Sequence, residues 1–321
     1  MTMSKTLRQS TLLFRSLLLA ALAFTASAQS PAPTAPSAPA RSAGTTQTTA
    51  DYTRTEDVVY GRKFGVALTL DVFQPARGAN GFGVIYLVSG GWRSSHEGVN
   101  PKLYAPYLER GYTVFAVVHG SQPKFIITEI VPDIHRAIRF IRHHAAQWGV
   151  NPQRLGLTGA SAGGHLSLTL GTQGGPGNPK DKDPIERESS AVQTVACFYP
   201  PTDFLNYGRE GEDAVGVGIL KNYVDAFGPE AATAEGRKKL GAAISPARFV
   251  TAQLPPTLIV HGDADALVPI QQAELFVQRA TAAGATARLI VKPGAKHGWP
   301  DSAVDRMTMA AWFDQYLRGV K

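Results

Sequence analysis

The chain of 321 residues contains one cysteine, Cys197, which lies in the apolar segment VQTVACFY. A single cysteine cannot form a disulfide within the chain, so the fold must obtain its stability from a large hydrophobic core. No cysteine follows the apolar segment near the N-terminus, so a lipoprotein anchor has no attachment point. These absences predict a buried, inert thiol at Cys197.

The sequence also lacks any block of basic residues. Its net charge is +7, and Lys5, Arg8 and Arg15 supply three of these charges within residues 1–28, where no acidic residue occurs. The remaining chain therefore carries a net charge of +4. A mildly basic surface without a Lys/Arg cluster gives no indication of nucleic acid as a partner.

A long apolar run is missing as well. The segment Leu17–Phe24 is too short to cross roughly 30 Å of hydrocarbon. Basic residues precede it and Ala26-Ser27-Ala28 follows it, an order typical of a secretory signal peptide. We expect residues 1–28 to be a signal peptide cleaved after Ala28, leaving a secreted or periplasmic protein without a membrane span.

Residues 29–50 (QSPAPTAPSAPARSAGTTQTTA) offer almost no side chain that a core could bury. They predict a disordered linker. Residues 51–321 then form one domain, because a chain with 44% hydrophobic and 18% charged residues has ordinary globular composition. Within it, residues 205–246 are polar, rich in glycine and partly helical, and we expect them to form a small cap-like insertion.

Strand-like and helix-like segments alternate from Asp51 onward. Most of the strand segments are apolar throughout, which a sheet covered on both faces requires; the segments are Asp57–Tyr60, Val66–Phe73, Phe82–Val88, Tyr112–Val118, Leu155–Thr158, Val192–Phe198, Thr257–Val260 and Ala287–Val291. The clearest helix is Glu129–Trp148, stopped by Gly149, with Pro132 in its first turn. The pattern predicts right-handed βαβ units and a doubly wound, mostly parallel sheet of about eight strands.

The pentapeptide GASAG, residues 159–163, places Ser161 at the centre of a G-x-S-x-G pattern. Chance alone supplies such a pattern in roughly one chain in six of this composition, so its context decides. A strand precedes it and a helical segment follows it, which predicts a nucleophile elbow with Ser161 at the positive end of a helix. His165, on the same helix, is interpreted as a packing and hydrogen-bonding residue rather than a base.

A serine hydroxyl needs a base, and the base needs an orienting acid. Downstream of Ser161, the strand TLIV leads into HGDADALVP and the strand LIVKPG leads into AKHGWP. The carboxyl ends of parallel strands meet at one edge of a sheet, so these loops should converge on Ser161. His297 is the candidate base, and Asp263 and Asp265 are the candidate acids.

These segments resemble the secreted bacterial α/β-hydrolase esterases, near the hormone-sensitive-lipase-like and acetylxylan/feruloyl esterase groups. The resemblance covers roughly residues 55–318 and rests on GGWRSS, GVNPQRLGLTGASAGGH, FYPPTDF, ISPARFV, HGDADALVP and KHGW. It implies an α/β-hydrolase fold and makes Asp265, at the end of H-G-x-x-D, the acid of the triad. Asp263 is kept as the reserve choice.

A tetrahedral intermediate also needs N–H donors for its oxyanion. Ala162 follows the serine, and Gly90 and Gly91 follow the strand GVIYLV, so the resemblance implies these three as donors. The family usually has H-G-G-G-W in that loop, and Val88 and Ser89 stand here in place of the histidine and first glycine. Trp92 and Trp299 flank the expected hole and base and are candidate walls of the substrate pocket.

We therefore expect a serine esterase that uses Ser161, His297 and Asp265 without a metal or organic cofactor. Its substrates would be small or polysaccharide-linked esters of short acyl groups, such as acetyl or feruloyl esters. Two alternatives stay open: a serine exopeptidase of the same fold, and a hydrolase-like binding protein without catalysis. The sequence leaves the natural ester and the oligomeric state undecided.

Overall fold

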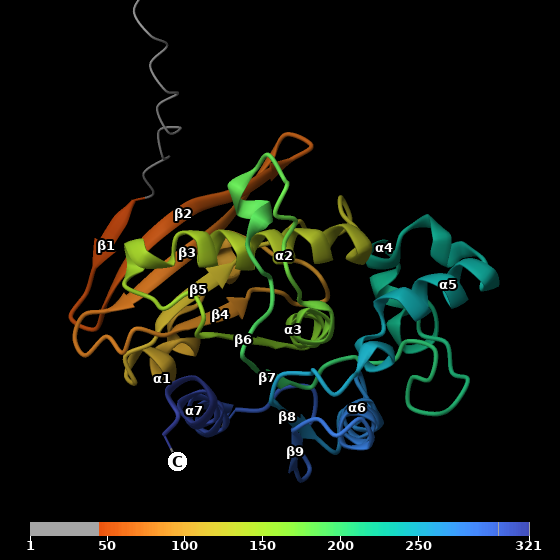
Figure 1. The fold of residues 1–321 in the computed structure, drawn as a ribbon. Helices are drawn as coiled ribbons and strands as arrows, with labels where there is room; N and C mark the ends of the chain where they lie inside the picture. Colours follow the sequence, from red (N-terminus) through yellow and green to blue (C-terminus); the bar gives the residue numbers. More distant parts are fainter. Residues whose placement is uncertain (1–44, 301, 321) are drawn as a thin grey trace, which may run out of the picture. The chain divides into compact units, whose positions relative to one another are not determined.

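The computed structural model describes residues 45–300 and 302–320, so the predicted signal peptide and most of the predicted linker lie outside the described residues. The described part contains one sheet of nine strands in the order β1-β2-β3-β5-β4-β6-β7-β8-β9 (Figure 1). The strands are β1 (Thr46–Thr48), β2 (Tyr52–Lys63), β3 (Val66–Pro75), β4 (Gly83–Leu87), β5 (Thr113–Val117), β6 (Leu155–Ala160), β7 (Thr194–Phe198), β8 (Thr257–Gly262) and β9 (Ala287–Lys292).

The sheet is antiparallel at its N-terminal edge and parallel elsewhere. Strands β1, β2, β3 and β5 pair antiparallel, whereas β5, β4, β6, β7, β8 and β9 pair parallel in that spatial order. All eight predicted strand segments lie within or overlap an observed strand, and the predicted doubly wound α/β-hydrolase sheet is confirmed.

Strand β1 is not among the eight predicted strands, and it corrects the predicted C-terminal bound of the disordered linker. Residues 46–48, which the sequence analysis assigns to the disordered segment 29–50, form β1 and pair with residues 53–55 of β2. All three β1 side chains are exposed, so no apolar pattern marked this strand. The strand β1 exists because it pairs with the long strand β2. Its two threonines are compatible with strand geometry.

Both faces of the sheet are covered. Successive side chains of a strand point to opposite faces, so Ile85 and Tyr86 enter two separate hydrophobic clusters. Helices α2, α3 and α6 bury their apolar side chains in the first cluster, and α1 and α7 bury theirs in the second. The helices are α1 (Ala105–Leu108), α2 (Ile127–His143), α3 (Ala162–Gln173), α4 (Val224–Phe227), α5 (Ala234–Ile244), α6 (Gln271–Ala282) and α7 (Ser302–Phe313).

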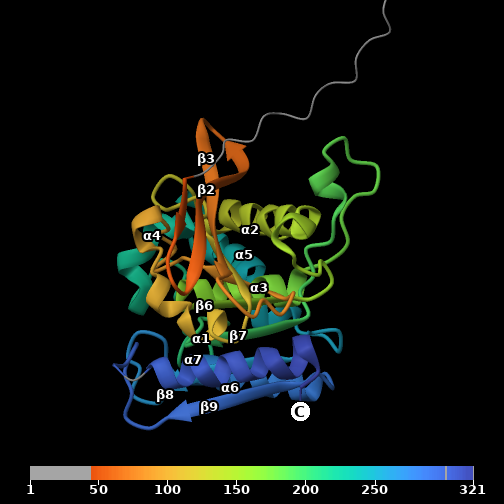
Figure 2. The same cartoon turned by 90° about the vertical axis from the view of Figure 1, so that its left-hand side faces the viewer.

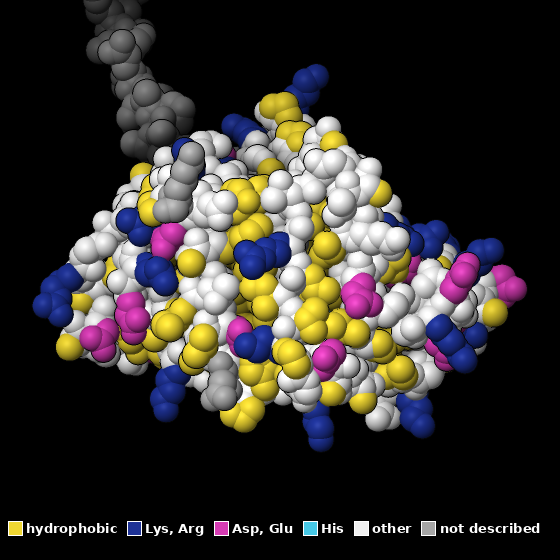
Figure 3. All heavy atoms as spheres, turned by 90° about the horizontal axis from the view of Figure 1, so that it is seen from below, with side chains coloured by type: hydrophobic (Ala, Val, Ile, Leu, Met, Phe, Trp, Pro, Cys, Tyr) yellow, Lys and Arg dark blue, Asp and Glu magenta, His cyan; other side chains and the backbone are white. Residues whose placement is uncertain are grey.

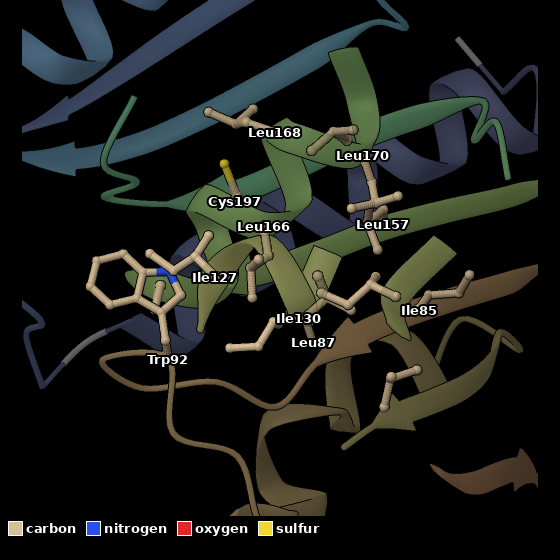
Figure 4. Packing of buried hydrophobic residues seen from close by; sticks show 14 of the residues in the cluster. Ile85, Leu87, Trp92, Ile127, Ile130, Leu157, Leu166, Leu168, Leu170 and Cys197 are labelled. Atoms are coloured by element: carbon tan, nitrogen blue, oxygen red, sulfur yellow. The ribbon is translucent and has the colours of Figure 1, made fainter. Parts of the chain in front are cut away.

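Figures 1 and 2 show α6 and α7 beside β8 and β9, at the end of the sheet opposite the β2–β3 pair. Figure 4 shows the first cluster, in which α3 packs its leucines against β6 and β7. Cys197 is buried there, as predicted, and burial raises the pKa of its thiol. The thiol is therefore protonated and shielded at neutral pH.

Helix α2 starts earlier than the sequence suggests. It begins at Ile127, so Pro132 is its sixth residue and the prediction that this proline lies in the first turn is wrong. The start is fixed by Glu129, whose carboxylate accepts a hydrogen bond from the Ile126 N–H at 3.0 Å. The helix ends at His143, and a 3₁₀ turn, Ala145–Trp148, continues to Gly149, which stops the segment with a φ of 63°.

The cap-like segment 205–246 lies between β7 and β8 in the chain and carries α4, α5 and two 3₁₀ turns, Gly218–Tyr223 and Pro229–Ala232. Figure 1 shows α4 and α5 at one end of the sheet, beyond α2 and α3. Phe227 packs against Trp92, with ring centroids 5.4 Å apart. The insertion therefore contacts the loop that follows β4.

No helix in the part of the chain that the structure describes is both long and apolar enough to cross a bilayer. The face seen in Figure 3 carries Lys, Arg, Asp and Glu side chains scattered among apolar atoms. That face has no continuous patch of one charge.

Candidate functional site

Ser161 lies between β6 and α3 with a strained backbone, at φ 54° and ψ −119°. Its N–H donates to the carbonyl of Phe198 at 3.0 Å. The turn requires glycine because the chains pass so closely: a Cβ on Gly159 would lie 2.5 Å from the backbone of Gly163, and one on Gly164 would lie 2.7 Å from the Phe198 carbonyl oxygen. The predicted nucleophile elbow thus has the expected local geometry.

The structure brings Ser161, His297 and Asp265 together. His297 follows β9 and its Nε2 lies 2.9 Å from the Ser161 Oγ, while its Nδ1 lies 2.7 Å from an oxygen of Asp265, which follows β8. The three loops meet because β6, β7, β8 and β9 run parallel and end at the same edge of the sheet.

Asp265, and not Asp263, reaches His297. One oxygen of Asp265 accepts hydrogen bonds from the N–H groups of Leu267 and Val268, both at 2.9 Å, and the other faces His297. Asp263 is exposed and accepts a hydrogen bond from the Gly294 N–H at 2.6 Å, which closes a turn. Of the two candidate acids, only Asp265 forms a hydrogen bond with His297, whereas Asp263 binds a backbone N–H.

The electrostatics of Asp265 favour its ionised form. Burial by itself would raise its pKa, but hydrogen bonds from His261, His297 and the Val268 N–H hold the pKa of this carboxyl well below its usual range. A carboxylate only accepts, so His297 Nδ1 must donate its hydrogen and Nε2 is left to accept from Ser161. This tautomer is the one that general-base catalysis requires.

His261 is a neighbour that sequence reasoning missed. Its side chain is fully buried at the end of β8, and its Nε2 lies 2.8 Å from the Val268 carbonyl oxygen and 3.4 Å from Asp265. It therefore braces the loop that presents Asp265. The signal available in the sequence was its position at the start of the H-G-x-x-D segment.

The loop after β4 corrects one predicted donor. The N–H of Gly90 donates to the carbonyl of Arg93 at 3.0 Å, and the N–H of Arg93 returns a bond to Gly90 at 2.9 Å. Because this tight turn engages the Gly90 N–H, the prediction that Gly90 donates to an oxyanion is wrong for this conformation. No described residue accepts a hydrogen bond from the Gly91 N–H.

Ala162 is the first residue of α3, so its N–H has no acceptor inside the helix. Gly91 has a φ of 54°, and a Cβ there would come within 2.5 Å of the Tyr223 ring from the insertion. Gly91 and Ala162 are thus the two predicted donors that remain, and the insertion packs directly on the first of them.

The structure places Trp92 in the core, which contradicts its predicted role as a pocket wall. Its side chain is 2% exposed and packs among core residues on the α2–α3 side of the sheet (Figure 4). Its Nε1 donates to Nδ1 of His165 at 3.1 Å, and His165 Nε2 donates to the carbonyl of Ile244 at 2.7 Å. The interpretation of His165 as a hydrogen-bonding residue is confirmed.

Trp299 lies close to the candidate base and is partly exposed. Its Nε1 donates to Asp305 at 2.7 Å, and its ring contacts Tyr199, which in turn lies 4.6 Å from the His297 ring. Trp299 therefore packs on Tyr199, the residue whose ring lies against His297. Contact with a substrate stays a prediction for this residue.

A cavity of about 470 Å³ lies close to Ser161 and is lined by the residue before it, Ala160. It lies between Ala160, the residue before Ser161, and the loop after β4. Its lining combines apolar and hydroxyl-bearing side chains, among them Tyr86, Val88, Ser89, Ser94, Leu103 and Ser121. A space of this size accommodates a small acyl group or part of an alcohol.

Glu56, Asp71 and His96 form the one group of possible metal ligands among the described residues, with ligand atoms within 4.8 Å of one another. Arg54 already lies among them: its guanidinium donates to Asp71 and pairs with Glu56 at 2.9 Å. A cation at this position would face the charge of Arg54, so the cluster is best described as an ion-pair network.

A model of the BD-FAE family matches residues 70–280. Among curated proteins, the chain is 29% identical over 233 residues to the "Probable carboxylic ester hydrolase LipM" of Mycobacterium tuberculosis (strain ATCC 25618 / H37Rv), covering 71% of this chain and 52% of that protein. It is 26% identical to the "Esterase LipQ" of the same organism over 80% of this chain and 60% of that protein. The chain thus spans only about half to three fifths of these relatives' length.

Two solved structures have a similar fold. A truncated carbohydrate esterase from gut microbiota superposes with a TM-score of 0.70 at 24% identity, covering 84% of this chain and 97% of that one. Apo esterase 2 of Thermogutta terrifontis superposes with a TM-score of 0.62 at 27% identity, covering 81% and 93%. These two structures share the α/β-hydrolase fold of this chain over most of their own length.

The buried His165 makes stability depend on pH. Burial lowers its pKa from 6.5 to about 4, and protonation of Nδ1 would break its bond with Trp92. The folded pKa is the lower one, so this contribution is complete above pH 6.5 and is lost as the pH falls towards 4. We expect His165 to account for a loss of about 3 kcal/mol in unfolding free energy over that range.

Urea unfolding at pH 7 and pH 4.5 measures this effect. His165→Gln should lose less unfolding free energy between the two pH values than the unchanged protein, although it is less stable at pH 7. His143→Gln, on the exposed side of α2, serves as the control and should follow the unchanged protein. An equal pH dependence in His165→Gln and the unchanged protein would contradict the assignment.

Proposed function

The chain belongs to the BD-FAE family, and we propose that it is a carboxylic ester hydrolase that forms an acyl-enzyme on Ser161. The observation that carries the proposal is the position of His297, with one ring nitrogen 2.9 Å from the Ser161 hydroxyl and the other 2.7 Å from the Asp265 carboxylate. Curated relatives named as ester hydrolases support the same reaction class.

In the proposed first half-reaction, the Oγ of Ser161 attacks the ester carbonyl carbon while His297 Nε2 takes the hydroxyl proton. The tetrahedral intermediate collapses, the bond to the alcohol oxygen breaks, and His297 returns its proton to that oxygen. Asp265 keeps the imidazole oriented and stabilises its positive charge. In the second half-reaction, water attacks the acyl-enzyme with the same proton transfers and releases the acid.

The negative oxygen of the intermediate would be stabilised by the N–H groups of Gly91 and Ala162. Ala162 also stands at the N-terminus of α3, a helix of 12 residues whose dipole favours negative charge at that end. These groups belong to the protein backbone. No metal or organic cofactor enters the proposed steps.

We propose short acyl esters as substrates, including acetyl or feruloyl groups attached to polysaccharide. The cavity of about 470 Å³ beside Ser161 suits a small group. Structural neighbours include the gut carbohydrate esterase and an acetyl ester-xyloside bifunctional hydrolase from Caldicellulosiruptor lactoaceticus, and those names describe the neighbours themselves. They support the choice of substrate class for this chain.

Asparagine substitutions of the two aspartates test the acid of the triad. Asp265→Asn can no longer hold His297 in the donating tautomer, so we expect kcat for 4-nitrophenyl acetate to fall about 10³–10⁴-fold. Asp263→Asn is the matched control and should change kcat by less than about threefold, since Asp263 only closes an exposed turn. A larger loss in Asp263→Asn than in Asp265→Asn would reverse the assignment.

A substrate panel tests the reaction class and the acyl length. Rates should be highest on 4-nitrophenyl acetate and butyrate and should fall for acyl chains of eight carbons or more, and acetylated xylan and methyl ferulate extend the panel. Peak activity on long chains would refute the short-acyl proposal. Hydrolysis of aminoacyl-nitroanilides without ester turnover would favour an exopeptidase, and absent labelling of Ser161 by a fluorophosphonate would favour a binding protein.

We also propose that the protein is exported and that its leader ends at Ala28, on the basis of the basic, apolar and small-residue order of residues 1–28. Expression of the full sequence in a Gram-negative host followed by N-terminal sequencing should give Gln29 as the first residue of the mature protein. Retention of the leader in the cytoplasm would contradict export.

A further inference from the structure

The cavity beside Ser161 is positively charged on one side. Arg93 is the one charged residue in its lining, and that side chain is exposed at the loop after β4. No aspartate or glutamate lines the cavity. Among the described residues, none provides a carboxylate that pairs with Arg93.

A second arginine, Arg306 of α7, lies behind the cavity lining. The guanidinium carbon of Arg306 lies 5.0 Å from the centre of the Phe198 ring, at the end of β7 next to the nucleophile strand. Its Nε is buried without a partner, and its Nη1 donates to the Ser302 carbonyl. Phe198 pairs with Ala160, which lines the cavity, so Arg306 lies next to the wall that β6 contributes.

The acidic groups around Arg306 are already engaged. Asp305 pairs with Lys292 at 3.0 Å and accepts from Trp299, and Asp265 is held by the candidate base. Among the described residues, Arg306 therefore has no carboxylate partner. A partly buried guanidinium without a counter-ion is costly, and an anionic ligand would relieve that cost.

One unpartnered hydroxyl group lies in the same cavity. Ser89 lines the cavity and its Oγ is buried without a hydrogen-bond partner. A buried hydroxyl donor with no acceptor points to an oxygen atom of a ligand.

We propose that this cavity binds a carboxylate carried by the substrate, so that the preferred esters are anionic. The inference rests on the proposed esterase function and narrows its substrate class. Arg306 and Arg93 supply the positive charge, and the unpartnered Ser89 hydroxyl supplies a further donor to a carboxylate oxygen. The carboxylate can belong to the acyl side, as in a half-ester of a dicarboxylic acid, or to the alcohol side, as in an acylated hydroxy acid.

Matched ester pairs distinguish these two sources. Monoethyl glutarate is compared with ethyl pentanoate for the acyl side, and acetoxyacetate is compared with propyl acetate for the alcohol side, by pH-stat titration at pH 7.5. For at least one pair we expect kcat/KM of the anionic ester to exceed that of the neutral ester about tenfold, mainly through a lower KM. Raising NaCl from 50 mM to 1 M should reduce this preference, because salt screens charges.

Glutamine substitutions test which arginine provides the positive charge that favours anionic esters. Arg306→Gln and Arg93→Gln should each lower the ratio of anionic to neutral kcat/KM, with Arg306→Gln lowering it at least about tenfold because its guanidinium is partly buried. Arg288→Gln, on the exposed side of β9, removes one positive charge far from the loop after β4 and is the matched control, with an unchanged ratio. The salt dependence of the unchanged protein tests the charge even if a variant fails to fold.

The outcomes separate this inference from the function on which it rests. Hydrolysis of neutral esters with no preference for either anionic partner overturns the inference and leaves the esterase proposal standing. An equal loss on anionic and neutral esters in Arg306→Gln also overturns it. No hydrolysis of any ester, together with no labelling of Ser161 by a fluorophosphonate, removes the proposed function itself.

Discussion

The strained backbone of Ser161 is the constraint on which the rest of the site depends. A positive φ at a residue with a side chain costs free energy and persists only where its surroundings hold it. Here the Phe198 carbonyl accepts from the Ser161 N–H, and the close approaches of Gly159 to Gly163 and of Gly164 to Phe198 leave no room for a Cβ at either glycine. This backbone conformation places the Ser161 hydroxyl at the start of α3, within hydrogen-bond distance of His297.

The insertion contributes to the same site through buried contacts. The bond from Trp92 to His165 and the bond from His165 to Ile244 join the loop after β4, helix α3 and the end of α5. Tyr223 packs on Gly91 from the other side. These contacts hold the loop that carries Val88 and Ser89 in its observed shape.

The features that could be predicted from the sequence are those that short residue patterns determine. Apolar strands, the small residues around Ser161 and the order of Asp265 and His297 all follow from segments a few residues long, and the structure has the same elements. The sequence did not reveal that the Gly90 N–H donates to the Arg93 carbonyl or that Trp92 is buried. It also did not reveal that Glu129 caps the start of α2 well before Pro132. The burial of Trp92 depends on tertiary packing and β1 depends on pairing with β2, whereas the Gly90–Arg93 turn and the Glu129 cap are local hydrogen bonds that the hydrophobic pattern does not mark.

The Trp92–His165–Ile244 connection has a consequence for the insertion. A flap that swings away from a site must leave the groups behind it intact, but α5 is joined to the loop after β4 through the fully buried His165. Displacing α5 would remove the acceptor of that bond and disturb the loop beside Gly91. The insertion is therefore part of the structure that supports the loop after β4, and its position and that of Gly91 depend on each other.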